Sequence, residues 1–134
     1  ELQAREGELG IWKKSSDVCS QCIILSELHN GAGEDDCRAG TEFVKLINSC
    51  SFKCDIDGWT IKDSATHIYK FSSISIMPQK ALTLYNGIGK DNENINKFFF
   101  NNKPNNGCYS LWNDDGDSLF LRDDDGGLVN FYRY

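Results

Sequence analysis

Six cysteines carry the most evident chemistry of this sequence: Cys19, Cys22, Cys37, Cys50, Cys54 and Cys108. An even, high count in a short chain is typical of disulfide frameworks, which persist in oxidising compartments. The pairs Cys19-x-x-Cys22 and Cys50-x-x-x-Cys54 also have a spacing that suits four thiolates around a tetrahedral zinc ion. We expect disulfides rather than zinc, and the βαβ context that a thioredoxin-like redox motif requires is not visible.

The sequence does not decide how the cysteines pair, because six cysteines allow many pairings. A bridge between Cys50 and Cys54 would clip the loop between them. Cys108 lies far along the chain and must pair across the fold if all six are bridged. The chain starts at Glu1 without a signal segment, so a mature form or a fragment fits, and we expect secretion from cysteine usage alone.

Three acidic clusters are the second candidate for chemistry. They span residues 34–36, residues 114–117 and residues 123–125. Asp-rich turns supply oxygen ligands at the short spacing that calcium prefers, although no stretch fits the EF-hand loop. The candidate calcium ligands are Asp114, Asp115, Asp117, Asp123, Asp124 and Asp125. The competing interpretation is that these clusters are solvated hairpin turns.

Catalysis is not expected. His29 and His67 are the two histidines, and neither is part of a G-x-S-x-G elbow. His67 lies near Asp63 and Ser64, so a base beside a nucleophile is conceivable, but a histidine at the start of a surface strand is commoner. The sequence also contains no P-loop and no G-x-G-x-x-G motif.

Charge and hydropathy exclude two classes of partner. The net charge is −6 and the only basic pair is Lys13-Lys14, so nucleic acid is not an expected partner, whereas cations or basic partners fit the acidic balance. No apolar run approaches the roughly 20 residues that a membrane span needs. Hydrophobic residues make up 40% of the 134 positions, enough for one domain with a core.

Segments with strand character follow one another at intervals of roughly 8–12 residues, as in sandwiches and barrels. No helical periodicity extends over three turns. The expected strands are 22–28, 42–48, 56–63, 67–71, 74–78, 81–85, 97–100, 109–112, 118–122 and 128–134. Residues 1–18 are expected to form an N-terminal arm, and residues 19–134 the domain.

Aromatic clusters near the end of the chain raise the question of an interface. Successive strand side chains alternate, so Phe98, Phe99 and Phe100 cannot all point inward. Phe131 and Tyr132 pose the same problem. Either a partner covers these rings or the N-terminal arm does, through Ile11 and Trp12.

The order of the motifs resembles the lamin-tail domain family, an immunoglobulin-like sandwich. The resemblance covers roughly 110 residues, and each motif alone is only weakly specific. The motifs are Ile23-Ile24-Leu25-Ser26-Glu27-Leu28, Glu42-Phe43-Val44-Lys45-Leu46-Ile47-Asn48, Gly58-Trp59-Thr60-Ile61-Lys62-Asp63, Tyr69-Lys70-Phe71, the Pro78-Gln79 turn, and the final stretch with Trp112 to Asp117, Leu119, Leu121, Asp123 and Gly126.

The resemblance implies an immunoglobulin-like β-sandwich of about seven to nine strands, with Trp59 between the sheets. It also implies a scaffold or tether and not an enzyme. Gln79 replaces the usual turn glycine, which leaves the geometry of that turn open. The cysteines are not part of the family pattern, and the helical rod of nuclear lamins is absent, so a nuclear filament role does not transfer. We therefore expect a secreted module for protein association or self-assembly, with calcium-dependent matrix binding as the alternative.

Overall fold

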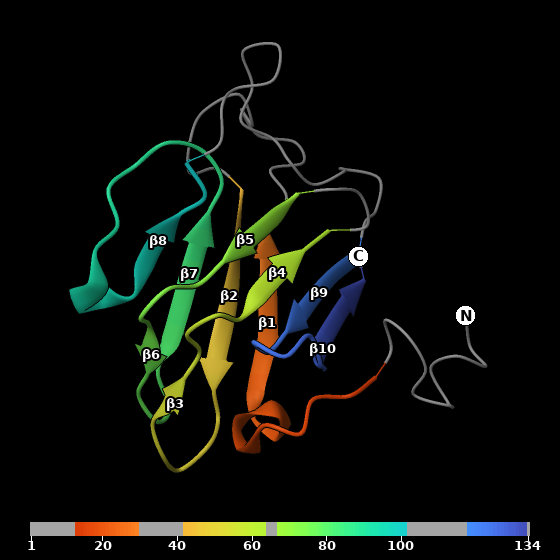
Figure 1. Cartoon of the computed structure of the whole chain (residues 1–134). Coiled ribbons are helices and arrows are strands. Elements are labelled where there is room, and N and C mark those ends of the chain that lie inside the picture. The colour runs from red at the N-terminus through yellow and green to blue at the C-terminus, as the bar shows by residue number, and fades with distance from the viewer. Residues whose placement is uncertain (1–12, 30–41, 64–66, 102–117, 134) are drawn as a thin grey trace.

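The computed structural model describes residues 13–29, 42–63, 67–101 and 118–133, and these residues form an all-β domain (Figure 1). Ten strands and two short 3-10 helices, η2 (Val18–Gln21) and η3 (Glu93–Ile95), occur within these ranges. The strands are β1 (Ile23–His29), β2 (Phe43–Asn48), β3 (Cys54–Asp55), β4 (Thr60–Lys62), β5 (Ile68–Lys70), β6 (Ser75–Ile76), β7 (Ala81–Tyr85), β8 (Lys97–Phe99), β9 (Ser118–Arg122) and β10 (Leu128–Arg133). The expected strand at 109–112 lies outside the described residues.

Two four-stranded sheets form the layers of a sandwich, with strand orders β1-β2-β7-β8 and β10-β9-β4-β5. In Figure 1 the second sheet lies in front of the first. The pairings are antiparallel except for β7 with β8, which run parallel. The predicted fold class, an immunoglobulin-like β-sandwich, is confirmed.

The core follows from strand periodicity, because alternate side chains of a strand point to the same face. Val44 and Leu46 of β2 are fully buried, and Lys45 between them is only half-buried. The same alternation holds in β7, and in β9 Leu119 and Leu121 lie inside. The spacing of two read from the sequence is therefore confirmed in these three strands.

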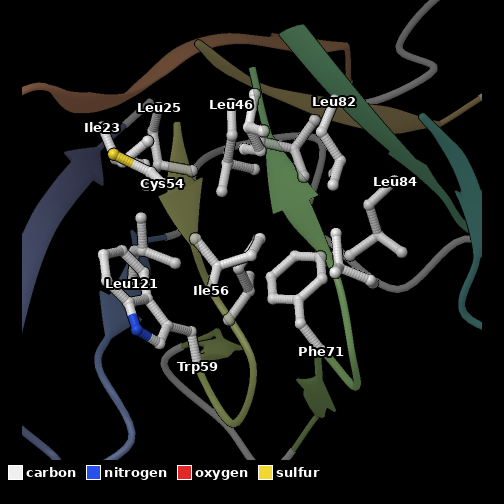
Figure 2. Packing of buried hydrophobic residues seen from close by; sticks show 14 of the residues in the cluster. Ile23, Leu25, Leu46, Cys54, Ile56, Trp59, Phe71, Leu82, Leu84 and Leu121 are labelled. Carbon is white, nitrogen blue, oxygen red and sulfur yellow. The ribbon is translucent and has the colours of Figure 1, made fainter. Parts of the chain in front are cut away.

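Trp59 and Phe71 fill the middle of the sandwich, where Figure 2 shows their rings among aliphatic side chains from both sheets. The chain reaches this position through Gly58, whose φ of +83° favours glycine. A Cβ at Gly58 would also lie 2.9 Å from Cβ of Asp124. Gly58 therefore allows the turn that places the ring of Trp59 in the core, and a larger residue at position 58 would strain this turn.

The structure shortens the expected strand at 56–63 to β4 and adds the two-residue strand β3 before it. A turn in which Trp59 N–H donates to the carbonyl of Ile56 (3.0 Å) separates β3 from β4. β3 pairs with β6 in a small separate sheet. With β3 included, the described residues contain ten strands, above the predicted seven to nine.

The turn at Pro78 and Gln79 keeps a left-handed residue despite the missing glycine. Gln79 has a φ of +63°, and Lys80 N–H donates to the carbonyl of Met77 (3.1 Å). The side-chain amide of Gln79 donates to the carbonyls of Ser49 (3.3 Å) and Cys50 (3.2 Å). These bonds tie the side chain of Gln79 to the neighbouring backbone, which helps to offset the strain of a left-handed conformation at a residue other than glycine.

The last residues of the expected N-terminal arm pair with the second sheet. Lys14 forms a parallel bridge with Leu128 at the start of β10. Ser15 N–H donates to the carbonyl of Leu128 (2.8 Å), and Leu128 N–H donates to that of Lys13 (2.7 Å). Residues 1–12 lie outside the described residues, so the boundary of the arm at residue 18 stays a prediction.

Among the residues that the structure describes, no helix is long and apolar enough to span a membrane.

Candidate functional site

Three aromatic rings form a row across the outer face of the β1-β2-β7-β8 sheet. Phe43 of β2, Tyr85 of β7 and Phe99 of β8 are register partners, so their side chains lie side by side. The ring centroids are 5.6 Å apart between Phe43 and Tyr85, and 5.3 Å between Tyr85 and Phe99, which are stacked. Each residue is half-buried, although its strand neighbour points into the core. We call these three residues the aromatic row.

Lysines flank the aromatic row. Lys45, Thr83 and Lys97 are register partners on the same three strands and face outward as well. The ammonium of Lys97 lies 5.0 Å from the ring centroid of Tyr85 and 5.7 Å from that of Phe99. The ammonium of Lys45 lies 5.8 Å from the ring of Phe43. Cations over aromatic faces are attracted by the ring quadrupole, so this face combines apolar area with positive charge.

The loop from β7 to β8 covers the free edge of β8. Asp91 accepts the backbone N–H of Phe99 (2.9 Å), and Asn92 pairs with Lys97 through N–H···O bonds of 2.7 Å and 3.0 Å. Strand edges that are paired in this way are not templates for another strand. The outer face is therefore a better candidate for a partner than the β8 edge.

The outer face of the other sheet carries a smaller aromatic pair. Phe120 of β9 and Phe131 of β10 are register partners with ring centroids 5.1 Å apart. The guanidinium of Arg122 lies 5.0 Å from the ring of Phe120, and that of Arg133 lies 5.7 Å from the ring of Phe131. Partial burial lowers the pKa of Arg122. This face offers two rings where the first offers three.

The residues expected at an interface are distributed over several environments. Phe98 is buried in the core, Phe99 belongs to the aromatic row, and Phe100 packs beside Tyr69 with centroids 5.4 Å apart. Tyr132 packs against the core. Ile11 and Trp12 lie outside the described residues. Of the residues predicted at an interface, Phe99 and Phe131 thus face outward, whereas Phe98 is buried and is not available to a partner.

Sequence reasoning missed Phe43, Tyr85, Lys45 and Lys97 as surface candidates. The signal was partly present, since Phe43 and Tyr85 alternate with the core residues Val44 and Leu84. The sequence does not show the order of strands in the sheet, which places β7 between β2 and β8.

Tyr69 lies at the rim of the core, between Phe71 and Phe100. Burial raises the pKa of its hydroxyl to about 12, and the negative charge of Asp91 adds to the effect. The neutral phenol is therefore the form that the fold favours.

Four of the cysteines form two disulfides at the end of the sandwich where η2 (Val18–Gln21) precedes β1. Cys19 bonds to Cys54, and Cys22 bonds to Cys50. A clip between Cys50 and Cys54 is therefore wrong, because each of these two residues reaches a sulfur of the segment 19–22 instead. Cys37 and Cys108 lie outside the described residues.

Asn48, which is fully buried, organises the loop that holds Cys50 and Cys54. Its Oδ1 accepts the N–H of Cys50 (2.8 Å), and its Nδ2 donates to the carbonyls of Phe52 (2.9 Å) and Ile76 (2.8 Å). A buried amide with its hydrogen bonds satisfied fixes the surrounding backbone.

Of the candidate calcium ligands, Asp123 has structural partners. It is buried, its Oδ1 accepts the N–H groups of Asp125 (2.9 Å) and Gly127 (2.8 Å), and its Oδ2 accepts the hydroxyl of Ser15. Asp124 and Asp125 are exposed. Asp114, Asp115 and Asp117 lie outside the described residues, and calcium binding stays a prediction.

His67 and Asp63 form a local pair. Nδ1 of His67 lies 2.6 Å from Oδ2 of the buried Asp63, whose Oδ1 also accepts the N–H of His67 (3.1 Å). Both bonds close the short connection between β4 and β5. Ser64 lies outside the described residues, so the nucleophile of the conceivable catalytic arrangement is not tested.

Two packed sheets with a central tryptophan define an immunoglobulin-like β-sandwich, a class that serves as a scaffold for many binding functions. The family model of the Lamin Tail Domain matches residues 20–134. The chain belongs to this family, which is one of structural and protein-interaction domains. A comparison with curated proteins finds no match.

Proposed function

We propose that the chain is a secreted, non-enzymatic module that associates with protein surfaces, including a second copy of itself, through the aromatic row. The observation that carries the proposal is the register of Phe43, Tyr85 and Phe99 on three neighbouring strands. Rigid aromatic side chains supply much of the energy of protein interfaces because they bury a large area at a small entropic cost.

The flanking lysines favour an acidic partner surface. Lys45 and Lys97 give this face positive charge, whereas the whole chain carries a net charge of −6. A second copy offers acidic surface at the turn between β9 and β10, where Asp124 and Asp125 are exposed. Contact between the face of one copy and the turn of another is head-to-tail, so it can propagate into larger assemblies.

Secretion is supported by the disulfides. Two bonds that join η2 to the loop at residues 50–54 would be reduced in the cytosol and persist outside the cell. If all six cysteines are oxidised, Cys37 and Cys108 are left to pair with each other. Peptide mapping of the unreduced protein would identify that bridge.

Sedimentation velocity over a concentration series would test the proposal. We expect the wild-type chain to self-associate, and the variant Phe43→Thr/Tyr85→Thr/Phe99→Thr to weaken association at least about tenfold, because hot-spot aromatics are lost while threonine keeps strand propensity. Higher salt should weaken the wild-type association, since it screens the lysines.

The matched control is Phe120→Thr/Phe131→Thr, which removes the two rings of the opposite outer face. We expect it to associate like the wild type. Equal association by all three proteins, or a wild type that stays monomeric at every concentration, would contradict the proposal. If the wild-type chain bound a single-stranded oligonucleotide at physiological salt and the triple variant of the aromatic row did not, the face would be assigned to nucleic acid instead.

A further inference from the structure

Four cysteine sulfurs gather at the end of the sandwich that precedes β1. The sulfurs of Cys19, Cys50 and Cys54 all lie within 4.8 Å of one another, and all three residues are buried. The sulfur of Cys22 is not a member of this group, but it is bonded to the sulfur of Cys50 and therefore lies beside it. Sequence reasoning treats disulfides and zinc as alternatives for these residues, but the geometry permits both as two states of one site.

One pair of sulfurs that are not bonded to each other, those of Cys50 and Cys54, has a separation that fits the edge of a zinc tetrahedron. The sulfurs of Cys50 and Cys54 are 3.7 Å apart. A Zn–S distance of about 2.3 Å implies an edge of about 3.8 Å between sulfurs in a regular tetrahedron. A sulfur pair released from a disulfide of about 2.05 Å must therefore separate by only about 1.7 Å to reach the same edge.

Hydrogen bonds that do not depend on the disulfides hold both cysteine pairs. Asp17 caps η2 and accepts the N–H of Cys19 (2.8 Å), and Cys22 N–H donates to the carbonyl of Cys19 (3.1 Å). The N–H and the hydroxyl of Ser49 both donate to the carbonyl of Cys22 (2.8 Å each), which joins the two segments.

The second pair depends on Asn48, whose side chain bonds to the backbone on both sides of the loop at residues 50–54. Its Oδ1 also lies 3.6 Å from the sulfur of Cys54. The segments that carry the sulfurs are thus held by backbone and amide contacts that do not include the disulfide bonds themselves.

We propose that the thiolates of Cys19, Cys22, Cys50 and Cys54 bind one Zn²⁺ when the two disulfides are reduced. Each disulfide takes two electrons and two protons from a reductant, such as a cellular dithiol, and becomes two thiols. Zinc then replaces the thiol protons, up to four in number, and forms four Zn–S bonds. The same sandwich is thereby closed by disulfides under oxidising conditions and by a metal under reducing conditions.

A cobalt titration would test the site, with Co²⁺ as the spectroscopic probe for zinc. The protein is Cys37→Ser/Cys108→Ser, reduced with a phosphine under anaerobic conditions. We expect thiolate-to-cobalt charge transfer and tetrahedral ligand-field bands that saturate at one Co²⁺ per chain. One equivalent of Zn²⁺ should abolish them, because thiolate sites prefer zinc to cobalt.

The control variant adds Cys54→Ser to the same background. Loss of a ligand should weaken the metal affinity by more than about tenfold, since loss of even an outer-shell partner costs that much. Cobalt binding equal in both proteins, no tetrahedral spectrum, or a stoichiometry other than one would overturn the proposal.

A second measurement, circular dichroism with added Zn²⁺, tests the site if reduction of the disulfides unfolds the chain. Zinc should then restore the β-sheet circular dichroism of the reduced protein and raise its melting temperature, because metal binding is coupled to folding. The full wild-type chain, reduced, should respond in the same way. No recovery with Zn²⁺ in either protein would also reject the site, and it would leave the proposed association through the aromatic row unaffected.

Discussion

The two faces of the β1-β2-β7-β8 sheet carry apolar side chains for different purposes. Leu84 and Tyr85 are neighbours in β7, yet Leu84 is fully buried and Tyr85 stacks on Phe99 at the surface. The inner face is aliphatic apart from Phe98 and meets Trp59 and the opposite sheet, whereas the outer face is aromatic and flanked by lysines. The difference shows that hydrophobicity alone does not separate residues that hold this fold from residues that a partner can use.

The largest effect should come from the inner face. Leu84→Ala removes a side chain that has no exposed area, so we expect a loss of about 2–5 kcal/mol in the free energy of unfolding. Urea unfolding followed by tryptophan fluorescence measures it. A loss no greater than that of Tyr85→Thr would abolish the distinction between the two faces.

The disulfides should contribute on a similar scale. Cys19→Ser/Cys54→Ser opens a bridge that spans 35 positions, and we expect the free energy of unfolding to fall by about 2–4 kcal/mol under oxidising conditions. Thermal and urea melts compare the variant with the wild type. The difference should disappear when both proteins are melted with reductant and a metal chelator, and a difference that persists would assign the effect to packing and not to the bridge.

Asp123 tests the attachment of the N-terminal segment. Asp123→Ala leaves the N–H groups of Asp125 and Gly127 and the hydroxyl of Ser15 without their acceptor. The expected cost is about 1–3 kcal/mol in the free energy of unfolding, from chemical denaturation. Ser15→Ala, which removes one of these bonds, should cost less. If calcium bound Asp123, added calcium would raise the melting temperature of the wild type and not of Asp123→Ala.

The outer face should matter less for stability than the inner face. Tyr85→Thr removes ring pairs with Phe43 and Phe99, so we expect it to lower the free energy of unfolding by about 0.5–1.5 kcal/mol and to weaken self-association. Urea unfolding and sedimentation of the same preparation give both quantities. Strong destabilisation without a change in association would place Tyr85 with the inner face.

A further effect is expected at alkaline pH. The pKa of Tyr69 is raised to about 12 in the folded protein from the ordinary value of 10.0, so the folded state keeps this proton longer than the unfolded state. The stability from Tyr69 is complete below pH 10 and is lost as pH rises towards 12. Tyr69→Phe should lack this component of the decline between pH 10 and 12. Tyrosinate absorbance follows the titration, and a Tyr69 that ionises near pH 10 would contradict it.

Much of the core could be predicted from the sequence, because the spacing of Val44 and Leu46, or of Leu119 and Leu121, is a local property of a strand. The position of Trp59 followed from the Gly-Trp motif. The aromatic row could not be predicted, since it depends on which strands are neighbours, and nothing local shows that β8 pairs with β7 in parallel.

The cysteines show the same limit. Their number indicates disulfides, but the partners of Cys50 and Cys54 depend on where η2 lies in the fold. Asn48 looks like an ordinary residue at the end of a strand, and its role is visible only once the carbonyls of Phe52 and Ile76 are placed around it.

The attachment of the segment before η2 has a mechanical consequence. If tension is applied at Lys13, the two backbone hydrogen bonds to Leu128 yield first. Extension then stops at Cys19, because its covalent bond passes the load to Cys54 in the interior of the domain. Tension applied at the N-terminal side is therefore transmitted to the sandwich through the Cys19–Cys54 disulfide, and the hydrogen bonds between β1 and β2 do not bear it.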